Sequence, residues 1–123
     1  MILGLHHIQL AMPPGREAEA RAFYAGLLGV SEVAKPTSTT PQGGAWFEAG
    51  PVKIHLGVEP DFRPSKKAHP AFVVRDLPAL LDRLRAAGVE AIESPMEGYA
   101  RAHVRDPFGN RIELMEPRAG SRP

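Results

Sequence analysis

Apolar and polar residues alternate along the first half of the chain with two different periods. In residues 5–12 every second position is apolar, which predicts a strand with Ile8, Leu10 and Met12 on one face and His7 on the other. Farther on, apolar residues recur with the i, i+3, i+4, i+7 spacing of a helix packed on one side, and Gly29 follows as its left-handed cap. The elements predicted for this half are a strand at 5–12, a helix at 20–28, a strand at 30–35, a loop at 36–44 and strands at 45–49 and 52–58.

The same order of elements restarts after residues 59–67, a stretch with two prolines and little periodicity. Asp76 is placed to cap a helix that ends at Gly88. A turn at 106–110 leads into the last strand, in which Glu113 faces away from the apolar residues. The elements predicted for this half are a strand at 68–74, the helix, strands at 89–93 and 100–105, and the last strand, up to Pro117.

The two halves match in position as well as in pattern. His7 and His69 are 62 positions apart, and His55 and Glu113 are 58 positions apart. A single repeat of about sixty residues indicates a structural duplication, because two copies are too few to stack as a solenoid. We therefore expect an α+β fold of two βαβββ modules in one domain. The predicted limits are about 3–58 for module 1, 59–67 for a linker, about 68–117 for module 2 and 118–123 for a C-terminal tail.

Composition excludes several classes of protein. The chain has 123 residues and a mass of 13.3 kDa, enough for one domain with its own core. It contains no cysteine, which excludes disulfides, zinc–thiolate sites and thiol nucleophiles. The net charge of +1 argues against a nucleic-acid partner, and no apolar run has the length of a membrane span or the pattern of a signal peptide. We expect a cytoplasmic protein with neither nucleic acid nor a membrane as partner.

Four side chains with metal-binding chemistry are predicted on the sheet faces opposite the apolar ones. His7 and His69 lie on the first strand of each half, and His55 and Glu113 lie on the last. Two curved sheets placed edge to edge would bring these side chains towards one cavity. Imidazole nitrogens and a carboxylate oxygen suit a divalent Zn, Ni, Co, Mn or Fe ion. A lone strand histidine is more often a surface or core residue, but the repeat-related positions favour a ligand role.

Three further residues are candidates for contact with a small-molecule substrate. Arg101 and His103 alternate with apolar residues, so their strand face either lines the same cavity or forms an exposed edge. Trp46 either stacks on a ligand or belongs to the core. The spacing does not decide between these roles.

Several stretches of the chain resemble the vicinal oxygen chelate superfamily. This superfamily includes glyoxalase I, methylmalonyl-CoA epimerase, extradiol dioxygenases, fosfomycin-resistance enzymes and bleomycin-binding proteins. The resemblance covers roughly residues 3–117 and implies paired βαβββ modules whose mixed sheet forms a cup around a divalent metal. The stretches that carry it are LHHIQL at 5–10, AFYAGLLG at 22–29, HPAFVVRDL at 69–77 and DPFGNRIEL at 106–114.

The resemblance also implies roles for the four metal-binding candidates. It places metal ligands at His7, His69 and Glu113, and a fourth ligand position at His55. Glyoxalase- and epimerase-like members usually carry Glu or Gln at that fourth position, so the histidine departs from their pattern. Family members pair their modules within one chain or between two, and we expect a homodimer because one helix covers only one face of each predicted sheet.

The function implied by the resemblance is that of a divalent-metal-dependent enzyme acting on a small oxygen-bearing substrate. Glyoxalase- or epimerase-like isomerase or lyase chemistry, with Glu113 as the base, is the first expectation. An Fe(II) extradiol-type dioxygenase is the alternative enzyme, since two histidines and one carboxylate suffice for it. A protein that sequesters a ligand or antibiotic without catalysis, as bleomycin-binding relatives do, is the third alternative.

Overall fold

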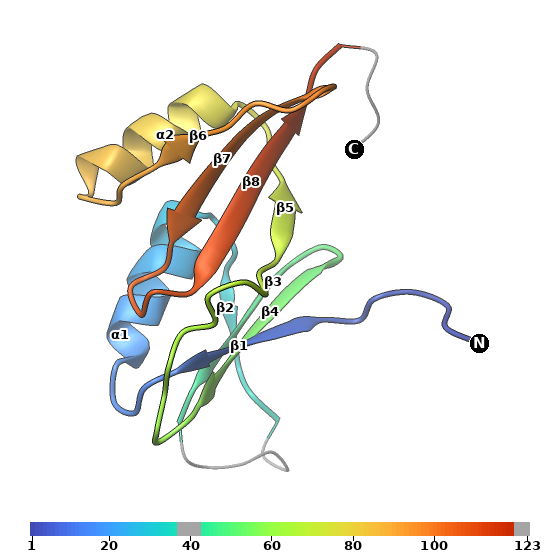
Figure 1. Cartoon of the computed structure of the whole chain (residues 1–123). Helices are drawn as coiled ribbons and strands as arrows, with labels where there is room; N and C mark the ends of the chain where they lie inside the picture. The colour runs from blue at the N-terminus through green and yellow to red at the C-terminus, as the bar shows by residue number, and fades with distance from the viewer. Residues whose placement is uncertain (37–42, 120–123) are drawn as a thin grey trace. The chain divides into compact units, whose positions relative to one another are not determined.

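The computed structural model describes residues 1–36 and 43–119, and the chain divides into two compact units. Unit 1 runs from Met1 to Pro64, and unit 2 begins at Ser65 (Figure 1). Each unit contains one four-stranded mixed sheet and one helical segment, in the order βαβββ. The predicted α+β fold of two βαβββ modules is therefore confirmed.

In unit 1 the first strand is paired with the last. Strand β1 lies parallel to β4, and β3 pairs antiparallel with both β4 and β2, so the sheet order is β1-β4-β3-β2. The helical segment begins with one α-helical turn and continues with π-helical bonding, in which the Leu28 N–H donates to the Phe23 carbonyl. The elements are β1 (Ile8–Met12), α1 (Glu17–Ala20), η1 (Arg21–Leu27), β2 (Glu32–Val33), β3 (Ala45–Ala49) and β4 (Val52–Val58).

The core of unit 1 lies between the helical segment and one face of its sheet. The Tyr24 and Phe47 rings are in contact, with centroids 5.5 Å apart, and both side chains are fully buried. Gly29 has the positive φ of 75° expected of the helix cap, and the helix end extends through a bond from the Val30 N–H to the Tyr24 carbonyl. Because Val30 belongs to this helix end, β2 is shorter than the strand predicted at 30–35. Most of the loop predicted at 36–44 lies outside the described residues.

Unit 2 repeats this topology with an α-helix in place of the π-helical segment. Its sheet order is β5-β8-β7-β6, with β5 parallel to β8 and the other pairs antiparallel. Helix α2 buries Leu77, Leu81 and Leu84, which recur with helical spacing on the side packed against the core. The elements are β5 (Ala71–Val73), α2 (Leu77–Ala86), β6 (Ile92–Glu93), β7 (Tyr99–Arg105) and β8 (Arg111–Pro117).

Carboxylates fix the start of α2 and the start of β8. The Asp76 side chain accepts a hydrogen bond from the Ala79 N–H at 3.3 Å, as predicted for the N-cap, and Glu116 accepts from the Asp76 and Leu77 N–H groups. In the turn before β8, Asp106 Oδ1 accepts from the Asn110 N–H at 2.8 Å. This closed turn sets the register between β7 and β8, and with it the neighbours of every side chain on β8.

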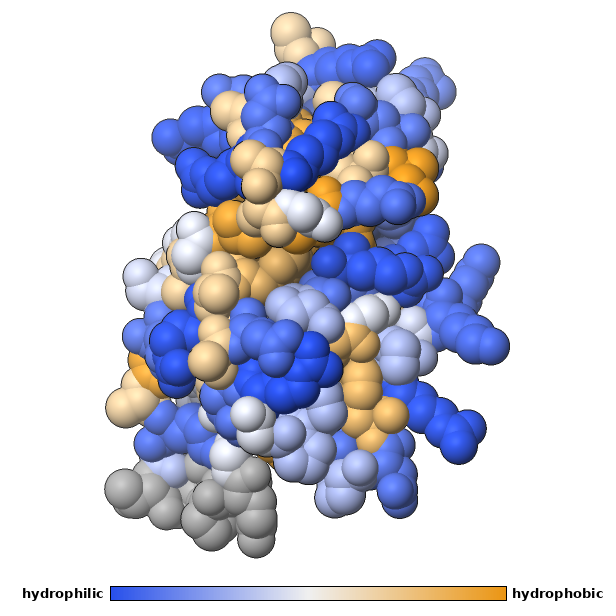
Figure 2. Space-filling model, turned by 90° about the vertical axis from the view of Figure 1, so that its left-hand side faces the viewer, coloured by the Kyte–Doolittle hydropathy of each residue, from blue (hydrophilic) through white to orange (hydrophobic). Residues whose placement is uncertain are grey.

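The visible surface in Figure 2 is largely hydrophilic, with apolar side chains gathered in smaller areas. In unit 2 the exposed apolar side chains include Val73 and Ile92, which lie on the two edge strands of the sheet. Among the described residues, no helix has both the length and the apolar character that a membrane span requires.

Candidate metal and substrate site

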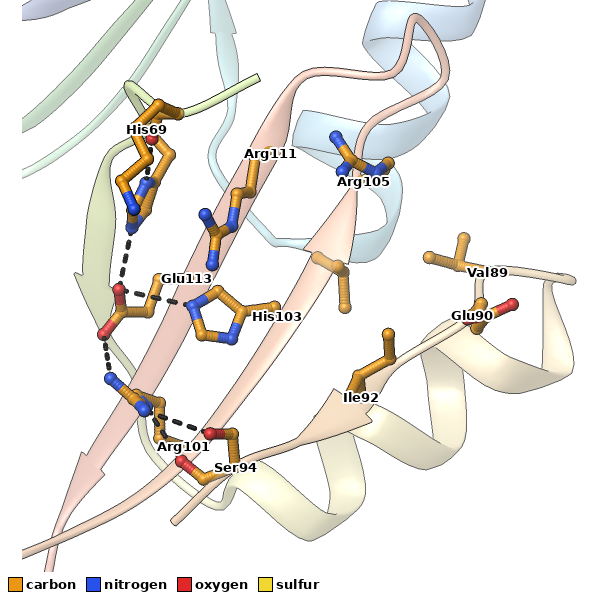
Figure 3. A pocket seen from close by; sticks show the side chains of 12 residues that line it. His69, Val89, Glu90, Ile92, Ser94, Arg101, His103, Arg105, Arg111 and Glu113 are labelled. Carbon is orange, nitrogen blue, oxygen red and sulfur yellow. Dashed lines mark hydrogen bonds and ion pairs between the residues drawn. The ribbon is translucent and has the colours of Figure 1, made fainter. Parts of the chain in front are cut away.

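Strand register in unit 2 brings two histidines, His69 and His103, next to Glu113. On β7, His103 lies directly opposite Glu113, and on the other side Ala71 of β5 is its partner. His69 lies two residues before Ala71, so strand alternation places it on the same face as Ala71 and Glu113. One ligand atom from each of His69, His103 and Glu113 lies within 4.8 Å of the others (Figure 3).

The hydrogen bonds of His69 determine which of its nitrogens faces Glu113 with a lone pair. Its Nδ1 lies 2.7 Å from the Lys67 carbonyl oxygen, and because a carbonyl oxygen only accepts, Nδ1 carries the proton. Its Nε2 lies 2.9 Å from Glu113 Oε1, which as a carboxylate oxygen also only accepts. A neutral imidazole would thus direct a lone pair at a carboxylate lone pair, so a proton or a metal cation is needed there. An anchored Nδ1–H is also the arrangement typical of metal-ligating histidines.

Arg101 holds the other oxygen of the Glu113 carboxylate. Its Nη1 lies 3.5 Å from Glu113 Oε2, while its Nε and Nη2 donate to the carbonyl and the hydroxyl of Ser94 at 2.8 and 3.0 Å. Glu113 is only 8% exposed. Burial alone would raise its pKa, but the hydrogen bond with His69 and the charge of Arg101 outweigh burial and lower the pKa of this carboxyl. Glu113 is therefore held as an anion, the state that a metal ligand needs.

His103 lies beside the pair formed by His69 and Glu113. Its Nε2 is 3.5 Å from Glu113 Oε1, and partial burial, followed by the positive charge of Arg111, lowers the pKa of the imidazole. His103 is therefore neutral at physiological pH, with a lone pair available for a proton. In contrast to His69, none of the described residues accepts a hydrogen bond from its Nδ1.

These side chains line a pocket of about 720 Å³ in unit 2. This volume lies within the range of about 300 to 1,000 Å³ typical of small-molecule sites. Val89 and Ile92 provide an apolar wall from β6 and the segment before it, and most of the polar groups come from β7 and β8 (Figure 3).

In unit 1 the equivalent positions form a stack of rings. Trp46 lies directly opposite His55 across β3 and β4, and the two rings stack at 3.7 Å between centroids with an interplanar angle of 1°. On its other side His55 stacks with His7 at 4.1 Å. His55 is buried, and burial together with the neighbouring His7 lowers its pKa. His55 thus occupies in the sheet of unit 1 the place that Glu113 has in the sheet of unit 2. Its neighbours there are the stacked rings of Trp46 and His7.

The structure divides the predicted site residues between the two units. His69, Glu113, Arg101 and His103 lie together on the pocket face of unit 2, whereas His7, His55 and Trp46 form the ring stack of unit 1. Ser94 and Arg111 also line the pocket and were not predicted from the sequence. Alternation along β8 was a signal for Arg111, which lies two residues before Glu113; Ser94 follows a two-residue strand and has no periodic signal.

The chain belongs to the Glyoxalase/Bleomycin resistance protein/Dioxygenase superfamily, whose family model matches residues 4–114. This match confirms the resemblance drawn from the sequence. No match was found among curated proteins.

Solved structures with the same fold include proteins of different kinds. A putative glyoxalase family protein from Bacillus anthracis is 44% identical, with a TM-score of 0.90 over 96% of this chain and 98% of that one. A variant of the fosfomycin resistance protein FosX from Listeria monocytogenes, complexed with Mn(II) and a dihydroxypropylphosphonic acid, is 21% identical, with a TM-score of 0.79 and coverages of 97% and 95%. TnmS3, an antibiotic binding protein from Streptomyces sp. CB03234, is 20% identical, with a TM-score of 0.73 and coverages of 96% and 100%.

Proposed function

We propose that the chain is a divalent-metal-dependent enzyme that moves a proton on a small oxygen-bearing substrate, as glyoxalase- and epimerase-like members of its superfamily do. The observation that carries the proposal is the contact between His69 and Glu113 in unit 2, where a proton or a metal cation is needed between two lone pairs. His69 Nε2 and Glu113 Oε1 lie 2.9 Å apart, and the ring's only other nitrogen already donates to the Lys67 carbonyl. A cation between them satisfies both lone pairs.

His69 and Glu113 are the residues of unit 2 that would hold the metal. A nitrogen and an oxygen donor without thiolate fit Mn, Fe, Co, Ni or Zn, and FosX, a protein of the same fold, has been crystallised with Mn(II). The bound ion would supply Lewis acidity to a substrate oxygen. Arg101 keeps the Glu113 carboxylate oriented and ionised, and the Lys67 carbonyl keeps the His69 ring in one tautomer.

His103 is the best candidate in unit 2 for moving the proton. Its imidazole is neutral at physiological pH and lines the pocket, and no described residue anchors its Nδ1 as the Lys67 carbonyl anchors that of His69. Glu113, which the family resemblance puts forward as the base, has a lowered pKa and is therefore a weak proton acceptor. We assign Glu113 to metal binding and His103 to proton transfer.

The predicted ligand roles of His7 and His55 stay predictions, and alanine replacements test them. A ligand's replacement lowers metal affinity and leaves folding intact, whereas a packing residue's replacement lowers the free energy of unfolding. The homodimer also stays a prediction, supported by the exposed apolar side chains Val73 and Ile92 on edge strands. Sedimentation at micromolar concentration measures the oligomeric state directly.

Metal content and proton exchange test the proposed function together. Protein purified without an affinity tag should contain a divalent metal, and His69→Ala should lose it. Loaded wild-type protein, incubated in D₂O with a panel of 2-oxo and 2-hydroxy compounds, should exchange a proton alpha to a carbonyl in the NMR spectrum, and His103→Gln should slow this exchange by about 10² to 10⁴. Unchanged exchange in His103→Gln would overturn the proton-transfer role.

A ligand-sequestering protein is the second candidate, and the ring stack of unit 1 favours it. The stack ends at Trp46, a half-buried indole on which an aromatic ligand can stack, and TnmS3, a protein of the same fold, is an antibiotic binding protein. Protein that contains no metal, binds none at micromolar concentration and exchanges no substrate proton would favour this function over catalysis.

An Fe(II) dioxygenase is the third candidate, because His69, His103 and Glu113 together form a set of two histidines and one carboxylate. Iron in the purified protein and oxygen consumption with catechols would support it. In that case His103→Gln would lower the affinity for iron, which the proton-transfer role does not require.

A further inference from the structure

We infer that Arg111 is the anion-binding residue of the unit 2 pocket, and that the ligand of this pocket carries a carboxylate or phospho group. The inference rests on the proposed function only in taking this pocket as the substrate site. Arg111 lies on β8 two residues before Glu113, and it lines the same pocket (Figure 3). Its side chain therefore projects from the same face of β8 as Glu113, two residues along the strand from the carboxylate that would hold the metal.

Arg111 differs from the other two arginines of the pocket in having no partner among the residues that the structure describes. Arg101 is occupied by the Ser94 carbonyl, the Ser94 hydroxyl and the Glu113 carboxylate. Arg105, opposite Arg111 across the strand pair, donates to the Gly109 carbonyl at 3.0 Å. Within residues 1–36 and 43–119, no group forms a hydrogen bond or ion pair with the Arg111 side chain.

The charge of the pocket favours an anion at this position. Four basic side chains line it, from Lys67, Arg101, Arg105 and Arg111, against two acidic ones, from Glu90 and Glu113. Glu113 is already engaged by His69 and Arg101, so it does not neutralise Arg111. A partly buried guanidinium whose N–H donors are not engaged by any described residue matches two oxygens of a carboxylate or phospho group.

The positions of Arg111 and Glu113 also determine what such a ligand looks like. An acidic group held by Arg111 leaves the remainder of a small ligand directed towards His103 and Glu113, the next residues on the same face. The ligand class is therefore a small acid with a second oxygen function a few bonds from its acidic group. A neutral compound of the same size leaves the guanidinium unpaired, and we expect it to bind more weakly.

Binding of simple anions to metal-free protein tests the inference. After chelator treatment and dialysis at low ionic strength, wild-type protein is titrated with inorganic phosphate, methylphosphonate, acetate and neutral acetamide, followed by ¹H–¹⁵N NMR. The matched variants are Arg111→Met and Arg105→Met. Arg111→Lys is a further variant that retains the charge but loses the planar guanidinium with its paired N–H donors. The Arg111→Met change should weaken binding of the preferred anion by about tenfold to a hundredfold, Arg111→Lys by less, and Arg105→Met by less than about threefold.

The same titrations separate phospho groups from carboxylates. Preference for phosphate and methylphosphonate over acetate identifies a phospho ligand, and the reverse preference identifies a carboxylate. Anion affinity that is equal in wild type and Arg111→Met overturns the inference, as does equal loss in Arg105→Met, which would mean that general pocket charge is responsible.

A parallel zinc titration keeps the inference distinct from the proposed metal site. The zinc affinity of Arg111→Met should lie within about threefold of the wild-type affinity. The reason is that the Arg111 side chain forms no hydrogen bond or ion pair with His69 or Glu113. Failure of wild-type protein to bind zinc, with anion binding intact and dependent on Arg111, would refute the metal site and leave the anion site standing. Loss of zinc binding in Arg111→Met would overturn the assignment of Arg111 to the anion alone.

Discussion

Replacing Glu113 by glutamine is the most direct perturbation of the proposed metal site. The change removes one negative charge and keeps the shape of the side chain. It also supplies an amide N–H, which can donate to His69 Nε2 across the present 2.9 Å distance. The variant therefore satisfies both groups without a cation, and we expect it to fold normally while losing affinity for the metal.

The size of this loss follows from the neighbours of Glu113. Groups that merely orient a metal ligand, as Arg101 orients Glu113 at 3.5 Å, are worth about 10- to 100-fold in metal affinity. The ligand itself must be worth at least the upper figure, about 100-fold, or about 2.7 kcal/mol. In metal-free protein, where only a hydrogen bond is exchanged for another, the free energy of unfolding should stay within about 1 kcal/mol of wild type.

Denaturant unfolding with and without metal measures both quantities in one experiment. At a free metal concentration 100 times the wild-type Kd, binding stabilises wild-type protein by about 2.7 kcal/mol. A variant with 100-fold weaker affinity gains only about 0.4 kcal/mol under the same conditions. Glu116→Gln is the matched control, because it makes the same change on the same strand at a carboxylate that caps α2; it should gain the full stabilisation.

A gain in Glu113→Gln within about 0.5 kcal/mol of the wild-type gain would refute the reasoning, because the carboxylate would then contribute less than a group that merely orients a ligand. Unfolding of the metal-free variant would refute a different step, namely that the glutamine amide can donate a hydrogen bond to His69 Nε2 in place of the cation.

Three further changes test separate parts of the structure. Arg101→Met should weaken metal binding by about tenfold, because the Glu113 carboxylate loses the group that orients it; calorimetric titration measures this, and affinity equal to wild type contradicts the orienting role. Glu116→Gln should lower the free energy of unfolding by about 1 kcal/mol, since a charged acceptor for two N–H groups at the start of α2 is lost; unchanged stability contradicts the capping role. The pKa of His55 is lower in the folded than in the unfolded chain, so the unfolded chain binds more protons below about pH 6.5 and wild-type stability falls as the pH decreases from 7 to 5. His55→Phe retains a stacking ring and cannot titrate, so its stability should fall less over this range; equal slopes in denaturant unfolding would show that His55 is not responsible.

Local sequence patterns determined the elements and the faces of the strands. Period-two alternation assigned His69, His103 and Glu113 to the side opposite the core, because successive side chains of a strand point to opposite faces whatever surrounds them. The α2 cap at Asp76 and the left-handed helix end at Gly29 were equally readable, since each depends on a few neighbouring residues. The superfamily followed from the same local stretches.

Tertiary structure alone decided which residue is next to which. Alternation places Arg101 and Arg111 on the same face as Glu113, but it does not say which guanidinium is occupied. That depends on Ser94 of the segment after β6, which reaches Arg101 through two hydrogen bonds and leaves Arg111 without a partner among the described residues. In the same way, the repeat made His55 equivalent to Glu113, yet the register of β3 and β4 places it against Trp46. Neighbours across strands are set by register and by turns far along the chain, and a pattern with period two carries no information about either.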